Sequence, residues 1–244
     1  ALRLVIPFTA GGGTDLVGRL LADGMGRMLK QTVVVDNKPG AGSMIGTDYV
    51  AKSQPDGYNL VVVTTAHAIN PSLMRKMPYK TVDSFAPVAL IGRAPNVLIV
   101  RPDSPFKTTR DMLAFARANP GKLTYGSSGN GTAVHLAAEL LQTAAGIKLT
   151  HVPYRGAGQA QVDLVGGQLD MVFATIPSAA GAMETGRVRA LGVTSAKRSP
   201  NLASDSHHCR NRGTGLRSRG VVRGACQGRN ACKRGCEVEW RCER

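Results

Sequence analysis

The spacing of hydrophobic residues predicts strands and helices in alternation. A short apolar strand, Leu2 to Ile6, leads through PFTAGGGTDL (7–16) into a segment with apolar residues at helical spacing. Thr14 is the expected N-cap of this helix. Its apolar face is expected to pack on the core and contains Leu16, Val17, Leu20, Leu21, Met28 and Leu29.

The same alternation continues through the first half of the chain. We expect a strand at 32–37, a glycine turn at 39–43, a helix at 45–52 and a buried strand at 60–65. This strand-helix-strand order is typical of a parallel sheet covered by helices.

The second half repeats the pattern after a junction near 98–106. Thr108 and Asp111 form a candidate capping box for a helix that ends before Asn119. We therefore expect two α/β units. The further strands are predicted at 85–92, 97–101, 123–127, 149–154, 169–174 and 188–195.

Three glycine-rich segments connect a strand to a helix: PFTAGGGTDL, YGSSGNGT (125–132) and PYRGAGQ (153–159). Helix N-termini carry free N–H groups and a partial positive charge, so such joints can hold an anion with main chain alone. They match neither the dinucleotide fingerprint nor the Walker phosphate loop. Three of them suit a small molecule with a carboxylate at each end. The alternative is a set of ordinary tight turns.

Side chains suited to catalysis or metal binding are few. His67, His135 and His151 have no metal-ligand spacing and are interpreted as structural or cleft-lining. The segment 126–129 reads G-x-S-G and misses the nucleophile elbow by one position. No nucleophile–base or acid–base pair is evident, which favours a binding protein with no metal and no cofactor.

Two carboxylates have other expected roles. Asp15, in the first turn of its helix, is expected to interact with the helix dipole. Asp170, at the start of a strand, is expected to face the cleft and accept a ligand ammonium group, or else to pair with an arginine.

Composition separates a body from a tail. The chain has a net charge of +15, of which +7 lies in residues 206–244. That segment also holds Trp240 and every cysteine. The body has no apolar run of the ~18 residues that a membrane helix requires. It begins directly in a strand, as expected of a cytoplasmic chain or of an exported chain whose leader has been removed. The cysteines are Cys209, Cys226, Cys232, Cys236 and Cys242.

Taken together, the motifs of residues 1–205 resemble the solute-binding receptors of tripartite tricarboxylate transporters, the Bug or TctC-type family of Gram-negative bacteria. The segments that carry the resemblance are RLVIPFTAGGGTD (3–15), VVVDNKPGAGSMIGTDYVAKSQPDGY (33–58), TTAHAINPSL (64–73), YGSSGNGTAVHLAAELL (125–141), VPYRGAGQAQVDLVGGQLDMVF (152–173) and RVRALGVTSAKRS (187–199).

The resemblance implies an α/β, two-domain, type II periplasmic-binding-protein-like fold with a ligand cleft between the domains. The first domain would span 1–100 and the second 101–204. It also implies a monomeric periplasmic receptor, not an enzyme, that delivers a small carboxylate to membrane permease subunits. The implied ligand-binding residues are Phe8, Thr9, Ala10, Gly11, Gly12, Gly13, Thr14, Asp15, Thr65, His67, Asn70, Ser127, Ser128, Gly129, Asn130, Gly131, Thr132, Tyr154, Arg155, Gly156 and Asp170.

Residues 205–244 depart from the family pattern, and we interpret them as translated out of frame. LRSRGVVRG (216–224) can be encoded so that a shift of one base gives Tyr-Glu-Val-Glu-Ala-Trp-Tyr-Gly, as the family would have there. The alternatives are a metal knuckle, although no C-x₂-C spacing is present, and a basic nucleic-acid arm.

The ligand expected from the sequence is an amino acid such as aspartate or glutamate, or a di- or tricarboxylate. Two other functions remain open: a small α/β hydrolase or transferase acting on a carboxylate, and nucleic-acid binding through the tail. Since the body offers no catalytic pair, we expect no catalysis. Since the arginines of the tail lack interleaved aromatic residues for base stacking, we expect no nucleic-acid partner.

Overall fold

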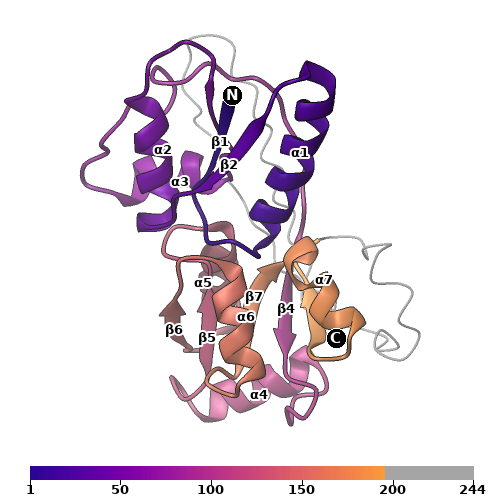
Figure 1. The fold of residues 1–244 in the computed structure, drawn as a ribbon. Coiled ribbons are helices and arrows are strands. Elements are labelled where there is room, and N and C mark those ends of the chain that lie inside the picture. Colours follow the sequence, from indigo (N-terminus) through magenta and orange to yellow (C-terminus); the bar gives the residue numbers. More distant parts are fainter. Residues whose placement is uncertain (196–244) are drawn as a thin grey trace.

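The computed structural model describes residues 1–195, which form two lobes stacked end to end (Figure 1). We call residues 1–95 the first lobe. It is built on a parallel sheet of three strands in the order β2-β1-β3. Its elements are β1 (Leu2–Ile6), α1 (Gly13–Leu29), β2 (Val33–Asn37), the 3₁₀ turn η1 (Ala41–Ser43), α2 (Met44–Ala51), β3 (Asn59–Val61) and α3 (Ala66–Leu73).

The second lobe, residues 96–195, holds a mixed sheet of five strands in the order β6-β5-β7-β4-β8. Its elements are β4 (Asn96–Val100), α4 (Thr109–Ala118), β5 (Thr124–Ser127), α5 (Ala133–Ala145), β6 (Thr150–Pro153), α6 (Ala157–Val165), β7 (Met171–Thr175), α7 (Ile176–Glu184) and β8 (Arg189–Val193).

Strand β4 breaks the predicted parallel pattern because it pairs antiparallel with both β7 and β8. The chain enters β4 from the first lobe and runs away from it, whereas β5, β6 and β7 run back towards it (Figure 1). The carboxyl ends of these three strands therefore face the first lobe. Although the domain prediction ended the first unit at residue 100, β4 belongs to the second sheet.

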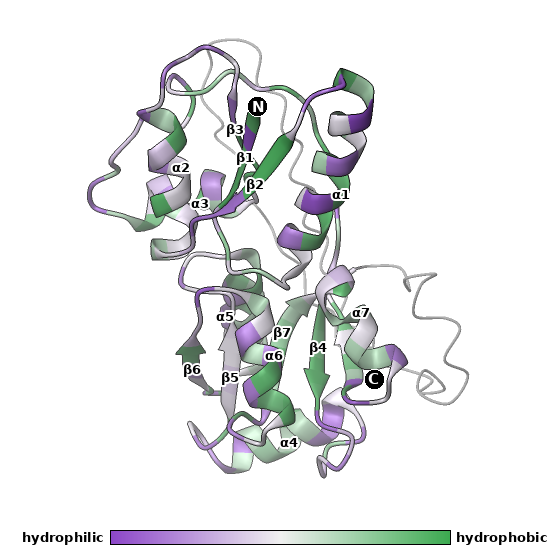
Figure 2. Cartoon of the chain, in the orientation of Figure 1, coloured by the Kyte–Doolittle hydropathy of each residue, from purple (hydrophilic) through white to green (hydrophobic). Residues whose placement is uncertain are grey.

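Apolar strands form the core of the second lobe on both faces of its sheet, as the green β4 and β7 of Figure 2 show. One face packs against α4 and α5 through Met112, Leu141 and their neighbours, and the other against α6 and α7 through Leu164 and Ala179. The helix α4 begins with the predicted capping box of Thr108 and Asp111, which is confirmed. The buried cluster of the first lobe is smaller and contains Leu4, Ile6, Phe8, Ala22 and Val62.

The predicted apolar face of α1 is confirmed at Leu21, which packs against the first-lobe core, but it is wrong at four other positions. The helix packs on β1 through Gly18 and Ala22, which lets it approach so closely that a side chain at Gly18 would overlap Ile6. The helix is capped by Gly12 and not by Thr14. The large apolar residues of the predicted face that lie exposed are Leu16, Leu20, Met28 and Leu29.

The strand predicted at 85–92 is absent as well. These residues have no regular secondary structure, and Val88 and Leu90 are exposed. A strand requires a neighbour for its main-chain hydrogen bonds, and the described part of the first sheet ends at β2 and β3. No helix within residues 1–195 is long and apolar enough to cross a membrane. The interpretations of residues 205–244 fall outside the described residues.

Candidate functional site

The two lobes meet along a seam where glycine-rich loops of each lobe contact those of the other. The Thr9 N–H donates to the Arg155 carbonyl across this seam at 3.3 Å. A side chain at Gly13, the first residue of α1, would come within 2.7 Å of Thr175 Oγ1. A side chain at Gly42 would overlap the Asn130 carbonyl. The N-termini of α1, α5, α6 and α7 thus converge on the seam.

The loop before α1 is fixed by Asp15, which is only 4% exposed. Its carboxylate accepts from the Gly11 N–H at 3.0 Å, Arg19 Nε at 2.9 Å and Asn37 Nδ2 at 2.9 Å. Burial alone would raise the pKa of Asp15, but these hydrogen bonds outweigh it and hold the pKa below its usual value. The carboxylate therefore stays ionised and holds the loop in place.

Asn37, at the end of β2, is a functional candidate that the sequence analysis missed. Besides Asp15, its Nδ2 donates to the Phe8 carbonyl at 3.0 Å, so one side chain holds the loop at two points. Phe8 itself packs in the first-lobe core. The only feature of the sequence that could have indicated this role is that Asn37 is a polar residue at the end of a strand.

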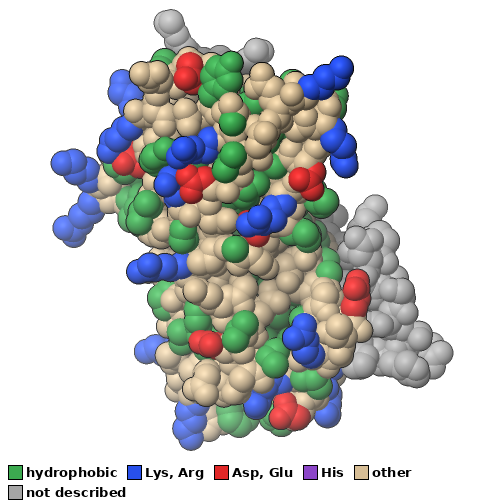
Figure 3. Space-filling view, in the orientation of Figure 1, with side chains coloured by type: hydrophobic (Ala, Val, Ile, Leu, Met, Phe, Trp, Pro, Cys, Tyr) green, Lys and Arg blue, Asp and Glu red, His purple; other side chains and the backbone are tan. Residues whose placement is uncertain are grey.

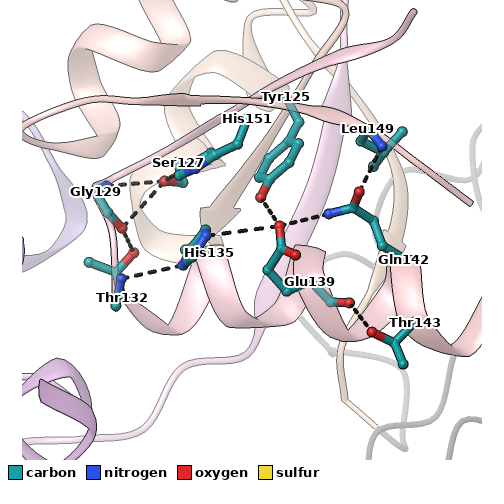
Figure 4. Close-up of polar contacts among 11 residues, drawn as sticks. Tyr125, Ser127, Gly129, Thr132, His135, Glu139, Gln142, Thr143, Leu149 and His151 are labelled. Atoms are coloured by element: carbon teal, nitrogen blue, oxygen red, sulfur yellow. Dashed lines mark hydrogen bonds and ion pairs between the residues drawn. The ribbon is translucent and has the colours of Figure 1, made fainter. Parts of the chain in front are cut away.

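The loop before α5 lies over a buried polar cluster (Figure 4). Ser127 is fully buried, and its Oγ accepts from the Gly129 N–H at 3.1 Å and lies 2.7 Å from His151 Nε2. His135 Nδ1 accepts from the Gly131 N–H at 3.3 Å. Thr132 Oγ1 donates to the Gly129 carbonyl at 2.6 Å.

His135 and His151 are distant in sequence, but their rings stack with centroids 4.4 Å apart. Ser127, the second residue of the G-x-S-G segment, pairs with His151. This pair is no nucleophile–base arrangement, since Ser127 has no exposed surface and its oxygen already accepts from Gly129.

The loop before α6 supplies Tyr154, Arg155 and Gly156. The Tyr154 hydroxyl donates to Asp163 at 2.5 Å, and burial together with this carboxylate raises the pKa of Tyr154 to about 12. The Arg155 side chain is exposed and has no ion pair within residues 1–195. A side chain at Gly156 would overlap Thr9 Oγ1, a buried hydroxyl that has no hydrogen-bond partner among residues 1–195.

Asn70 of α3 also reaches the seam. It is fully buried, its Nδ2 donates to the Gly42 carbonyl at 3.0 Å, and a side chain at Gly131 would lie 2.9 Å from its Oδ1. His67, by contrast, bonds to the Thr81 carbonyl at 2.8 Å and packs against aromatic rings of its own lobe. Thr65 precedes α3 at its N-cap.

The expectation that Asp170 faces the cleft is wrong. Its carboxylate accepts from the N–H and Oγ1 of Thr124 at 2.8 and 2.9 Å, at the amino ends of β5 and β7. The joints follow the carboxyl ends of these strands, about 13 Å away at 3.3 Å per residue. Asp170 therefore joins two strands at the far edge of the sheet.

The structure thus sorts the predicted residues by position. Of the described residues, Thr175 and Ser178 at the N-terminus of α7 and Gly42 in η1 belong to the seam but were missed. Thr14 and Asp15 lie in the first turn of α1, and Ser127, Ser128, Thr132 and Tyr154 belong to the second-lobe joints. The predicted residues that contact the opposite lobe are Thr9, Ala10, Gly11, Gly12, Gly13, Asn70, Gly129, Asn130, Gly131, Arg155 and Gly156.

Charge on the described surface is mixed. On the face shown in Figure 3, Lys and Arg side chains are spread over both lobes with Asp and Glu among them. Within residues 1–195, no group of three or more His, Cys, Asp and Glu residues could hold a metal ion.

Comparison with known proteins agrees with this architecture. Residues 17–208 match the family described as "Tripartite tricarboxylate transporter family receptor". A Pseudomonas sp. (strain P51) relative, the UPF0065 protein in the tcbD-tcbE intergenic region, is 42% identical over 81% of this chain. This chain spans 59% of that relative's length.

Three solved structures share the fold. The periplasmic binding protein BugD is 37% identical, with a TM-score of 0.78 over 83% of this chain and 68% of BugD. R. palustris Rpa4515 with adipate is 38% identical, with a TM-score of 0.80 over 83% and 68% of the two chains. MatC from Rhodopseudomonas palustris with bound malate is 31% identical, with a TM-score of 0.77 over 82% and 68%.

Proposed function

Because this chain belongs to the family of tripartite tricarboxylate transporter receptors, we propose that it captures a small dicarboxylate at the seam between its lobes. The family consists of periplasmic substrate-binding receptors and not of enzymes, so the chain is a periplasmic receptor. The fold is that of two-lobed periplasmic binding proteins.

The convergence of four helix N-termini on the seam is the observation that carries this proposal. The helices α1 and α5 to α7 direct the positive ends of their dipoles towards it from two lobes, and such ends stabilise anions. A ligand with a carboxylate at each end would satisfy both lobes at once. The adipate and malate of the two solved relatives have this chemistry.

An amino acid is a less favoured ligand than the sequence suggested. That suggestion relied on Asp170, which lies at the far edge of the second sheet. Asp15, the carboxylate nearest to the first loop, already accepts from three donors. Since a ligand ammonium would find no free carboxylate in either position, we infer a preference for dicarboxylates without an amino group.

The proposed site consists of the predicted residues at the seam together with Gly42, Thr175 and Ser178. The proposed partners are the membrane permease subunits of a tripartite transporter, with the receptor acting as a monomer. Closure of the lobes over the ligand would be the signal that the permease reads.

A thermal-unfolding panel tests the ligand class. The full chain is heated with L-malate, adipate, L-aspartate or L-glutamate, and with adipamide as a neutral control. An acid at 100 times its dissociation constant adds ~2.7 kcal/mol to the free energy of unfolding. We expect malate or adipate to raise the melting temperature and adipamide to leave it unchanged. An equal shift by adipamide would contradict the proposal.

A further inference from the structure

We propose that His135 and His151, as neutral imidazoles, position the second-lobe ligand loop, so that acid releases both the loop and the ligand. The loop in question is Gly129, Asn130 and Gly131, which we call the GNG loop. The part that concerns the ligand rests on the proposed function, whereas the part that concerns the loop rests on geometry alone.

His135 holds the GNG loop through its last residue. The Gly131 N–H donates to His135 Nδ1 at 3.3 Å, so this nitrogen must keep its lone pair and the ring proton must be on Nε2. Gly131 has a φ of +76° and lies directly against Asn70 of the first lobe. A proton on Nδ1 would face the Gly131 N–H and remove the bond that places this glycine at the seam.

His151 holds the first residue of the loop through Ser127. The Ser127 Oγ accepts from the Gly129 N–H, and His151 Nε2 lies 2.7 Å from the same oxygen. The Gly129 carbonyl, the other possible acceptor, is 3.4 Å away, which is beyond the usual range for an O–H donor. The Ser127 proton therefore points to Nε2, which is an acceptor only while the imidazole is neutral.

Burial of the two rings disfavours charge on either, and the Glu139 carboxylate opposes this effect only in part. From α5, Glu139 lies 3.9 Å from His135 Nε2, but its Oε1 accepts at 2.6 Å from Tyr125 and at 2.7 Å from Gln142. From β5, the Tyr125 ring stacks on His151 with centroids 4.7 Å apart.

At Gly131, the first lobe presents the uncharged Asn70 and Leu73. Burial lowers the pKa of His135, and burial together with His135 lowers that of His151 to about 4.

Because of this arrangement, a fall in pH weakens the hydrogen bonds that hold the GNG loop. At neutral pH both rings accept hydrogen bonds that fix Gly129 and Gly131. As the pH falls, protonation replaces an acceptor with a donor at each position and places two positive rings in a stack. At His151 the bond to Ser127 reverses its direction, and at His135 the Gly131 N–H loses its acceptor, so the GNG loop loses its support at Gly131 and a carboxylate bound at its main chain is released.

Amide hydrogen exchange tests the loop without any ligand. We expect the His135→Ala substitution to lower the protection factor of the Gly131 amide about tenfold at pH 7, as loss of one hydrogen bond implies. His135→Asn places an uncharged acceptor near the Nδ1 position and should preserve the protection. In the unsubstituted chain, the protection at Gly131 should fall between pH 7 and pH 4.5, and in His135→Asn it should not. An unprotected Gly131 amide at pH 7, or one unaffected by His135→Ala, would overturn the proposal.

Calorimetric titration tests the consequence for the ligand. The full chain and a double variant, His135→Asn with His151→Gln, are titrated with adipate and with L-malate at pH 7 and pH 4. Protonation of the ligand's own carboxylates lowers the affinity of both proteins equally. Only the difference between their losses of affinity therefore reports on the imidazoles. We expect the unsubstituted chain to lose about tenfold more affinity than the double variant, a difference of ~1.4 kcal/mol.

Equal losses in the two proteins would overturn the release of ligand by acid. If neither acid binds the unsubstituted chain at pH 7, the proposed function fails, and the exchange experiment still decides the role of the histidines. If the two histidines had a purely structural role, the variants would differ from the unsubstituted chain in their free energy of unfolding. Their affinity for the acids would still depend on pH as strongly as that of the unsubstituted chain.

Discussion

Thr9 and Gly156 face each other across the seam, and the missing side chain of Gly156 makes room for the Thr9 hydroxyl. The neighbouring main chain joins the same loops, since the Thr9 N–H donates to the Arg155 carbonyl at 3.3 Å. Two loops of different lobes are therefore in direct contact, and any atom added at position 156 must separate them.

Substitution of Gly156 by alanine should weaken ligand binding. Gly156 has an extended φ of 176°, which alanine adopts without strain, so the effect comes from the overlap with Thr9. We expect the affinity for adipate or malate to fall at least about tenfold in calorimetric titration.

The matched control is Gly181→Ala in α7, where an added methyl group meets no atom within 4 Å. This variant should bind like the unsubstituted chain and be equally or more stable, by up to ~1 kcal/mol. Equal affinities of the two variants would argue against a ligand site that depends on contact between these loops.

Asn37→Ala should loosen the first loop. The substitution removes the donors to the Phe8 carbonyl and to Asp15, and leaves buried acceptors unpaired. Urea unfolding should show a loss of about 1–3 kcal/mol, accompanied by weaker binding of the dicarboxylate. Asn119→Ala removes a similar bond to the Phe115 carbonyl at the end of α4, distant from the seam, and should leave the affinity unchanged. Unaltered binding in Asn37→Ala would exclude Asn37 as a support of the site.

Thr108→Ala should destabilise the chain without affecting the ligand. Thr108 Oγ1 accepts from the Asp111 N–H at 3.1 Å in the capping box of α4. Loss of such a cap costs about 0.5–2 kcal/mol. Chemical denaturation measures the loss, and titration of the same variant should give the affinity of the unsubstituted chain. A change in affinity would connect α4 to the site, which the described contacts do not.

The free energy of unfolding should fall as the pH decreases from about 6.5 to about 4. The unfolded histidines titrate near 6.5, whereas burial lowers the pKa of His135 and that of His151 in the folded chain, the latter to about 4. Within this range the unfolded state binds more protons, so acid favours unfolding. The loss should be on the order of 2 kcal/mol. Urea titrations at several pH values measure it, and a flat profile would contradict the buried neutral pair.

Much of the fold could be predicted from the sequence because its signals are local. The capping box of Thr108 and Asp111, the glycine joints and the strand at 33–37 all depend on residues close together in the chain. The errors concern partners that are distant in sequence. Residues 85–92 have the composition of a strand but no neighbouring strand within the described residues. The approach of α1 to β1 is set by Gly18 against Ile6, which helical periodicity does not reveal.

The candidate site shows the same difference between local features, which the sequence predicts, and partners that are distant in sequence, which it does not. The loops were identified from their glycines, yet the side chains that hold them come from elsewhere. His151 reaches Ser127 from a neighbouring strand, and Asn37 reaches Asp15 from another. Asp170 was misplaced although its position directly before β7 carries the relevant information: the joints follow the carboxyl ends of parallel strands, so a residue at the start of such a strand lies at the opposite edge of the sheet.

The most direct test of the central claim is calorimetric titration of the full chain at pH 7 with adipate and with L-malate, with adipamide as the uncharged counterpart. If helix N-termini of both lobes bind a ligand that carries a carboxylate at each end, at least one acid should bind with a stoichiometry of one, and adipamide should give no binding heat. A cooperatively folding chain that binds neither acid, or that binds adipamide as tightly as adipate, would contradict the account.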